Sequence, residues 1–181
     1  KLTDTDINVE ATATERTAFY RFTYGGEDQA KLLVDLQSGV VFNQEWLHTH
    51  VLSSTVNMPD RWTLTGEQET QNWVRRKFFY CIKFDHPYTL VSTLEKQEGE
   101  KGDRLILGFD LNPSEPLQVK VAFSTVGIEG AERALLAEAQ EWDFEAVRMK
   151  TEDKWRNLLS RMEITGTDDQ KVSAYTSLYH L

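Results

Sequence analysis

Few side chains in this 181-residue sequence have both the type and the spacing that chemistry requires. The segment His48-Thr49-His50 puts two imidazoles on one face of an extended chain, an arrangement that could bind a metal ion. No HExxH, CxxC or Asp-rich loop supplies a third ligand, so a solvated or hydrogen-bonded pair is the favoured interpretation. The single cysteine, Cys81, lies in the middle of an apolar segment, which predicts a small buried side chain rather than a nucleophile.

Three tryptophans offer a second kind of site, because sugar rings stack their apolar faces on indoles. Trp46, Trp62 and Trp73 fall in an irregular stretch between expected strands, where a binding platform could be built. The alternative is that they fill the protein core or a helix contact, as we expect for Trp142 and Trp155. Carboxylate pairs, which glycoside hydrolysis needs, are too numerous in this acidic chain to be informative. Residue chemistry alone therefore indicates no catalytic residue and no metal ligand, and leaves the three tryptophans as substrate-binding candidates.

Composition excludes several classes of partner. Twenty Lys and Arg against 29 Asp and Glu give a net charge of −9, whereas nucleic-acid binding needs a basic surface. No apolar run in the sequence is long enough to span a membrane. Hydrophobic residues make up 40% of the chain, so it can bury a core without a disulfide or a metal ion. We expect a globular protein that binds neither nucleic acid nor a bilayer core.

The first two thirds of the chain alternate between apolar and polar residues, as strands with one buried face do. Turn signals with glycine or proline separate the alternating segments. The pattern predicts a mainly β fold, an antiparallel β-sandwich over residues 1–127, in which residues 40–75 are the least regular part. The alternating segments are residues 16–24, 32–36, 78–84, 105–111 and 119–123.

After Gly127 the apolar residues recur with the period of helices, so we expect two or three C-terminal α-helices over residues 128–181. Residues 129–140 are rich in Ala, Glu and Leu and contain no proline. Asp143 can cap a second helix, whose apolar stripe runs from Phe144 to Met162. Thr167 with Gln170 resembles a capping box that opens a third helix. The apolar face of that helix would consist of Val172, Tyr175, Leu178 and Tyr179.

Three separated stretches of the sequence together resemble glycoside hydrolase family 92. Residues 11–16 (ATATER) and 19–24 (FYRFTY) are similar to the family's ELTATxRxGxxRYTF segment, and LLVDL follows at residues 32–36. Residues 119–124 (VKVAFS) and 129–131 (EGA) are similar to VKVGISxVSxEGA. Residues 142–148 (WDFEAVR), Trp155 and residues 175–180 (YTSLYH) are similar to GWDFDAVR…W…YTALYH. Because order and spacing agree over nearly the whole chain, the resemblance is specific.

The resemblance implies a fold and an activity. Family members are calcium-dependent, inverting exo-α-mannosidases, many of which act on α-1,2-linked mannose of N-glycans. They combine an N-terminal sandwich of the supersandwich type, helical linkers and a large C-terminal barrel of paired helices. The family's catalytic acid, catalytic base and calcium ligands lie in that barrel, so the resemblance assigns no catalytic or metal-binding residue to this chain. Calcium is implied for the parent enzyme only, and the implied partners are a mannose-containing glycan and the barrel in cis.

Three interpretations follow from the sequence. The first is a non-catalytic N-terminal part of an α-1,2-mannosidase: a sandwich over residues 1–127 and a helical linker over residues 128–181. The resemblance then implies an extracytoplasmic, bacterial protein. The second is a stand-alone carbohydrate-binding sandwich that uses the tryptophan candidates, and the third is a structural domain whose helices bind a partner. The chain begins without Met and stops inside an expected helix, which favours the first interpretation.

Overall fold

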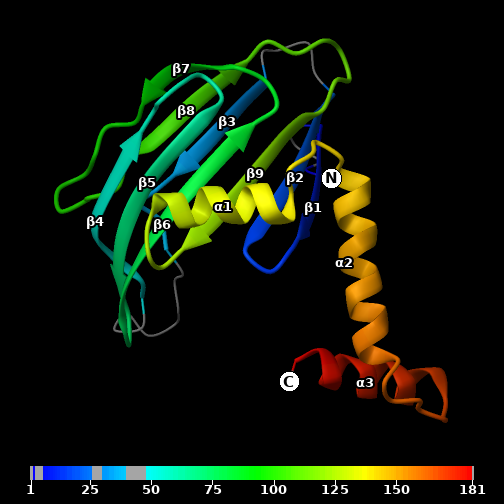
Figure 1. The fold of residues 1–181 in the computed structure, drawn as a ribbon. Coiled ribbons are helices and arrows are strands. Elements are labelled where there is room, and N and C mark those ends of the chain that lie inside the picture. The colour runs from blue at the N-terminus through cyan, green and yellow to red at the C-terminus, as the bar shows by residue number, and fades with distance from the viewer. Residues whose placement is uncertain (1, 3–5, 26–29, 40–47, 181) are drawn as a thin grey trace.

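The computed structural model describes residues 2, 6–25, 30–39 and 48–180. Nine strands precede three helices in the described part of the chain (Figure 1). The strands are β1 (Ile7–Ala13), β2 (Thr17–Tyr24), β3 (Ala30–Asp35), β4 (His50–Asn57), β5 (Thr63–Gln71), β6 (Arg75–Phe84), β7 (Tyr88–Thr93), β8 (Arg104–Phe109) and β9 (Leu117–Ser124). The helices are α1 (Ile128–Glu138), α2 (Phe144–Leu159) and α3 (Asp168–Tyr179). None of these helices is long and apolar enough to cross a membrane.

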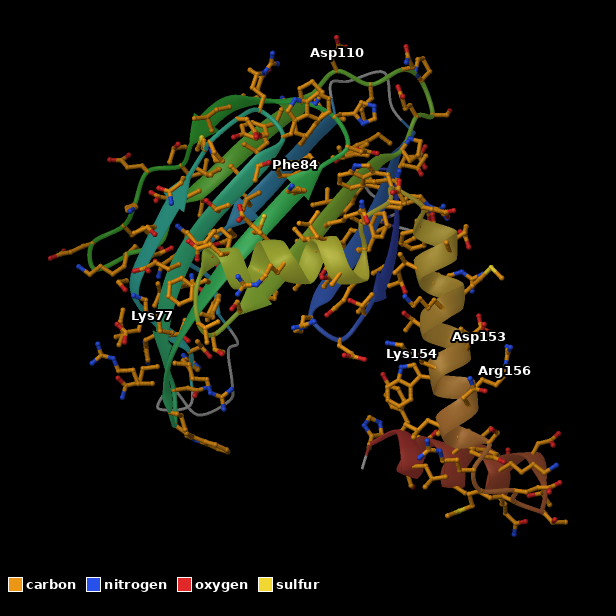
Figure 2. All side chains as sticks on the ribbon, in the orientation of Figure 1. Lys77, Phe84, Asp110, Asp153, Lys154 and Arg156 are labelled. Carbon is orange, nitrogen blue, oxygen red and sulfur yellow. The ribbon has the colours of Figure 1, made fainter. Side chains whose placement is uncertain are left out.

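The strands form two antiparallel sheets. The larger sheet has the order β1-β2-β9-β6-β5-β4, and the smaller has the order β3-β8-β7. Apolar side chains of the two sheets meet in the main core, near one end of which lies Phe84 (Figure 2). The prediction of an antiparallel sandwich followed by C-terminal helices is therefore confirmed. The fully or nearly fully buried residues of this core include Leu64, Tyr80, Phe84, Leu105, Leu107, Phe109, Leu117 and Val119.

Helices cover the other face of the larger sheet, so its central strands are buried on both sides (Figure 1). Ala131, Ala134 and Leu135 of α1 pack on Cys81 and Ala122. Cys81 is fully buried, as predicted, and burial raises the pKa of its thiol to about 11. The alternation of the sequence predicts one buried face per strand, and β9 departs from it because α1 covers its second face.

The helix ends follow the predicted capping residues. The Asp143 side chain accepts a hydrogen bond from the Ala146 amide at 2.9 Å and caps α2. Thr167 and Gln170 form the predicted capping box of α3. Only the first part of the expected apolar stripe of α2 packs on the sheet, since Phe144 and Val147 are its buried residues. None of the residues of α3 is buried.

Candidate functional site

The structure separates the tryptophans that the sequence offers as a sugar platform. Trp62 precedes β5 and is 47% exposed, whereas Trp73 lies in the turn after β5 and is 76% exposed. The nine residues of β5 place them roughly 30 Å apart, at opposite ends of the sheet. Trp46 lies outside the described residues. Trp62 and Trp73 therefore do not form one platform, and each stays a separate substrate-binding candidate.

No metal centre is found among the described residues, where no group of three His, Cys, Asp or Glu side chains could hold an ion. His50 is exposed at the start of β4, next to the half-buried His48 and Thr49. The family resemblance implies calcium, but the described part of the chain does not fit a calcium site. No reaction step is derived through a metal ion for these residues.

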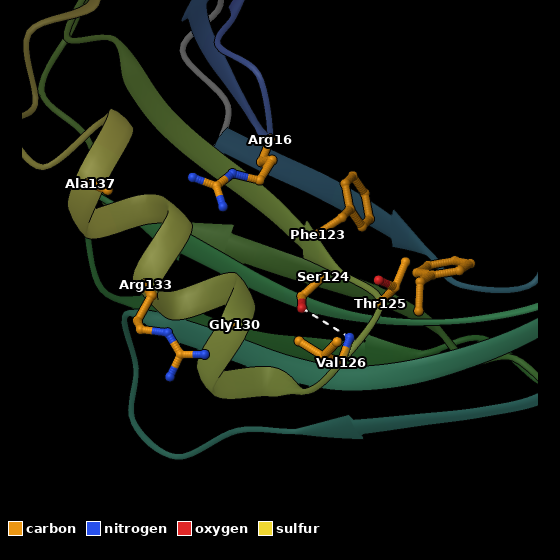
Figure 3. Close-up of a pocket in the computed structure, with 9 residues that line it drawn as sticks. Arg16, Phe123, Ser124, Thr125, Val126, Gly130, Arg133 and Ala137 are labelled. Carbon is orange, nitrogen blue, oxygen red and sulfur yellow. Dashed lines mark hydrogen bonds between the residues drawn. The ribbon is translucent and has the colours of Figure 1, made fainter.

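A groove of about 650 Å³ lies between α1 and the end of β9 (Figure 3). Phe123 and Val126 supply much of its apolar wall, and Arg16 and Arg133 add positive charge. The Val126 amide donates to Ser124 Oγ at 3.2 Å, which holds the turn at the groove's edge. Glycoside hydrolysis requires a carboxylic acid and a carboxylate facing one cavity, and the lining of this groove contains neither.

The densest set of side-chain contacts outside the main core lies where the helices join the larger sheet. We call this set the junction; it consists of Phe19, Arg21, Lys120, Trp142, Phe144 and Glu145. Its centre is the ring of Phe19 on β2, which is fully buried. This ring meets Trp142 edge-on at 5.9 Å between centroids and Phe144 edge-on at 5.4 Å. A strand, the α1–α2 connection and the first residue of α2 thus share one aromatic cluster.

Arg21 adds an ionic contact on the outer side of the junction. Its guanidinium binds both carboxylate oxygens of Glu10 on β1, each at 2.7 Å, and reaches Glu145 of α2 at 2.8 Å. The same guanidinium lies 4.4 Å above the ring of Phe144. The hydrogen bond from Arg21 holds the pKa of Glu10 below its usual value. Hydrogen bonds from Arg148 and Arg21 likewise lower the pKa of Glu145.

Glu138, in the last turn of α1, ties that helix to the turn between β1 and β2. It accepts hydrogen bonds from Thr14 Oγ1 at 2.6 Å, from the Arg16 amide at 2.9 Å and from Arg16 Nε at 2.6 Å. Burial alone would raise the pKa of Glu138, but these hydrogen bonds outweigh it and lower the pKa. A general acid needs a raised pKa near neutrality, so neither Glu138 nor the carboxylates at Arg21 suit that role. These ion pairs and hydrogen bonds join α1 and α2 to β1, β2 and the turn between them.

Sequence reasoning predicted the helix contacts of Trp142 and Phe144 but missed the charged members of the junction. Arg21 and Lys120 stand on the polar side of their alternating segments, which predicts exposure, yet Arg21 lies against α2 and Lys120 lies under the α1–α2 connection. The only available signal was that both fall inside stretches that resemble the family, in FYRFTY and VKVAFS.

Comparison with known proteins agrees with this geometry. The model of the glycosyl hydrolase family 92 N-terminal domain matches residues 1–124, and that of the family's catalytic domain matches residues 130–181. None of the curated protein sequences matches this chain. A family GH92 α-mannosidase from Bacteroides thetaiotaomicron has the same fold, with a TM-score of 0.78 at 24% identity over 99% of this chain and 25% of that one. Its complex with mannoimidazole gives the same values.

A family GH92 inverting mannosidase from the same species superimposes with a TM-score of 0.77 at 21% identity. That match covers 96% of this chain and 24% of the mannosidase. The chain thus spans about a quarter of the length of these solved structures. At these identities the solved structures establish a shared fold only. Membership of the family rests on the family models, because the model of the N-terminal domain alone matches more than half of the chain. The chain belongs to glycoside hydrolase family 92, with its strands in the region of the N-terminal domain and its helices in the region of the catalytic domain.

Proposed function

We propose that this chain is the part of an α-mannosidase that joins the N-terminal sandwich to the catalytic domain and holds the two in a fixed relation. The junction carries the proposal, because it binds the first helices of the catalytic region to β2 and β9 of the sandwich. Family membership supports the substrate class, and a solved relative of the same fold binds mannoimidazole. The substrate of the whole protein would be a mannose-containing glycan, with α-1,2-linked mannose as the expected linkage.

In this proposal the chain supplies no catalytic group. An inverting glycosidase needs an acid and a base roughly 6.5–9.5 Å apart with room for water between them. The carboxylates Glu10, Glu138 and Glu145, which lie where the helices meet the sheet, are instead bound to arginines. The acid, the base and the calcium ion would belong to other parts of the catalytic domain. An extracytoplasmic location, where glycans occur, is part of the same proposal.

Exposed apolar side chains on α2 and α3 indicate where the rest of the catalytic domain would pack. Beyond its buried start, α2 carries Trp155 and Leu158 at 37% and 48% exposure. On α3, Val172 and Tyr179 are 65% and 53% exposed. A groove of about 570 Å³ between the β1–β2 turn and α2 continues this surface. Because family 92 relatives are about four times as long as this chain, we propose that further helices of the catalytic domain cover it in cis.

Of the two described tryptophan candidates, Trp73 is better placed to reach the substrate. The turn that carries it lies beyond Lys77, at the end of the molecule towards which α2 descends to α3 (Figures 1 and 2). Trp62 lies at the other end of β5, where its carbonyl accepts a hydrogen bond from the Phe84 amide at 2.9 Å. We propose that Trp73 contacts either the sugar or the catalytic domain, and that Trp62 contacts neither.

Hydrolysis of an aryl α-mannoside in the presence of calcium tests the proposal. The whole protein should release the aryl group, whereas the purified 181-residue chain should give no more turnover than a mock-purified control. Clear turnover by the 181-residue chain, or none by the whole protein on any α-mannoside, would contradict the proposal. In the whole protein, Trp73→Ala should raise KM or lower kcat, and the matched variant Trp62→Ala should change neither.

A further inference from the structure

Lys120 is an unusual residue for the centre of a sheet, because its side chain is almost fully buried, at 2% exposure. It lies on β9, where it pairs with Phe19 of β2 on one side and Lys83 of β6 on the other. Burying an ammonium group is costly unless other groups replace its water. Among the described residues, no carboxylate lies within ion-pair distance of its Nζ atom, so other groups must satisfy it.

The α1–α2 connection provides those groups. Lys120 Nζ donates to the carbonyl oxygens of Gln140 at 3.2 Å and Glu141 at 2.8 Å. It also lies 3.7 Å from the centroid of the Trp142 ring and 5.0 Å from that of Phe19. Three consecutive residues of the connection therefore contact one side chain of the sheet. Because two carbonyls and a ring of the connection contact one buried amine, a change in the conformation of the connection would take acceptors away from that amine.

The contact also compensates the end of α1. A helix leaves its last carbonyls without partners and carries partial negative charge there. The last turn of α1 contains no basic residue. Lys120 brings a donor and a positive charge from the sheet to the chain just beyond that helix end. Asp143, two residues after Glu141, then caps α2, so the direction of α2 depends on how the connection is held.

We infer that Lys120 is a positioning residue: it holds the α1–α2 connection in one conformation and thereby sets the direction in which the catalytic helices leave the sandwich. The inference rests on the proposed function only in taking α2 and α3 as helices of a catalytic domain. The two can fail independently, because the direction of α2 can be measured without any activity.

The test measures the distance between the sheet and the far end of α2 in the 181-residue chain. Spin labels on Ser53→Cys and Asn157→Cys, both exposed positions, report this distance by pulsed electron paramagnetic resonance, and the fully buried Cys81 stays unlabelled. The 16 residues of α2 span roughly 24 Å, so a rotation of about 15° at its start moves its end by about 6 Å. Lys120→Met keeps the apolar stem and removes the donors. We expect a shift or broadening of about that size.

Lys83→Met is the matched control. Lys83 is the cross-strand neighbour of Lys120 on the same face, and its side chain makes no hydrogen bond or ion pair with the described residues. Its variant should keep the narrow wild-type distribution. Trp142→Leu, at a partly exposed position, removes the ring over the amine and should broaden the distribution even if Lys120→Met does not fold. An unchanged distance distribution in a folded Lys120→Met variant would overturn the inference. If Lys120→Met does not fold, an unchanged distribution in Trp142→Leu would overturn it. Broadening by Lys83→Met equal to that of Lys120→Met would also overturn it.

Discussion

Replacing Phe19 with alanine should remove the centre of the junction. Its ring is fully buried and makes two edge-to-face contacts, to Trp142 and Phe144. Truncation of a buried phenylalanine to alanine costs roughly 3–5 kcal/mol of the free energy of unfolding, which combines lost transfer energy with the cavity left behind. For a chain of this size, each kcal/mol lowers Tm by roughly 2–4 °C. A loss of about 4 kcal/mol therefore predicts a fall in Tm of roughly 8–16 °C.

Phe19→Leu separates the aromatic contacts from simple burial. Leucine keeps most of the apolar volume and loses the two edge-to-face contacts, each worth about 0.5–1.5 kcal/mol, so a cost of roughly 1–3 kcal/mol is expected. Phe123→Ala is the matched control on β9, because that ring is 48% exposed and makes one edge-to-face contact, with Phe78. Its cost should be about 1 kcal/mol. Urea unfolding followed by circular dichroism and tryptophan fluorescence measures all three, and a Phe19→Ala cost no larger than that of Phe123→Ala would refute the reasoning.

Three further predictions concern charge and the exposed helices. Burial lowers the pKa of Lys120 to about 8, against the opposing influence of Glu141 and Asp85 and with a small contribution from Lys83. The unfolded lysine keeps its proton up to about pH 10.5, so between pH 8 and pH 10.5 the unfolded state binds more protons than the folded state. In this range the free energy of unfolding of the wild type should therefore rise with pH relative to that of Lys120→Met. A difference that falls from pH 7 to pH 9.5 in urea titrations would contradict this sign. Glu138→Gln should lower the free energy of unfolding by about 1–3 kcal/mol at pH 7, because its hydrogen bonds to Thr14 and Arg16 become weaker. In urea titrations this loss should vanish as the pH falls from 4.5 through the lower pKa of Glu138 in the folded state. Tyr175→Glu with Tyr179→Glu should raise solubility and leave the Tm of the 181-residue chain nearly unchanged, because α3 has no buried residue; a loss of several degrees would show that α3 belongs to the core.

The elements that sequence analysis predicted well are those whose signal is local. Alternation over residues 78–84 and 105–111 predicts strands β6 and β8, because a strand with one face in the core needs apolar residues at every second position. Asp143 and Thr167 predict helix starts, because a capping side chain lies within three residues of the amide it accepts from. The sequence does not predict the strands β4 and β5 clearly, because polar residues occupy both faces of each strand and hide the alternation. In β5, for example, the neighbouring residues Glu67 and Gln68 lie on opposite faces.

The junction could not be predicted in the same way, because its contacts join residues far apart in the chain. Lys120 reaches carbonyls 20 and 21 residues later, and Arg21 reaches Glu145 across 124 residues. A lysine in a strand is ordinarily exposed, and nothing near Lys120 in the sequence indicates that the α1–α2 connection will cover it. The backbone carbonyls that satisfy it have no sequence signature at all. Burial of this residue is a consequence of tertiary packing.

The contacts of the junction give a physical reason why the family can be identified from a chain in which no catalytic residue is assigned. The stretches that resemble family 92 all contribute to the same cluster: residues 19–24 supply the Phe19 ring and the Arg21 guanidinium, residues 119–124 supply Lys120, and residues 142–148 supply Trp142, Phe144 and Glu145. Loss of Trp142 or Phe144 would take an edge-to-face contact from the buried Phe19 ring, and loss of Trp142 would also take the ring over the Lys120 amine, so the contacts within the cluster depend on one another. In this chain, part of the resemblance to family 92 thus falls on residues that join the helices to the larger sheet.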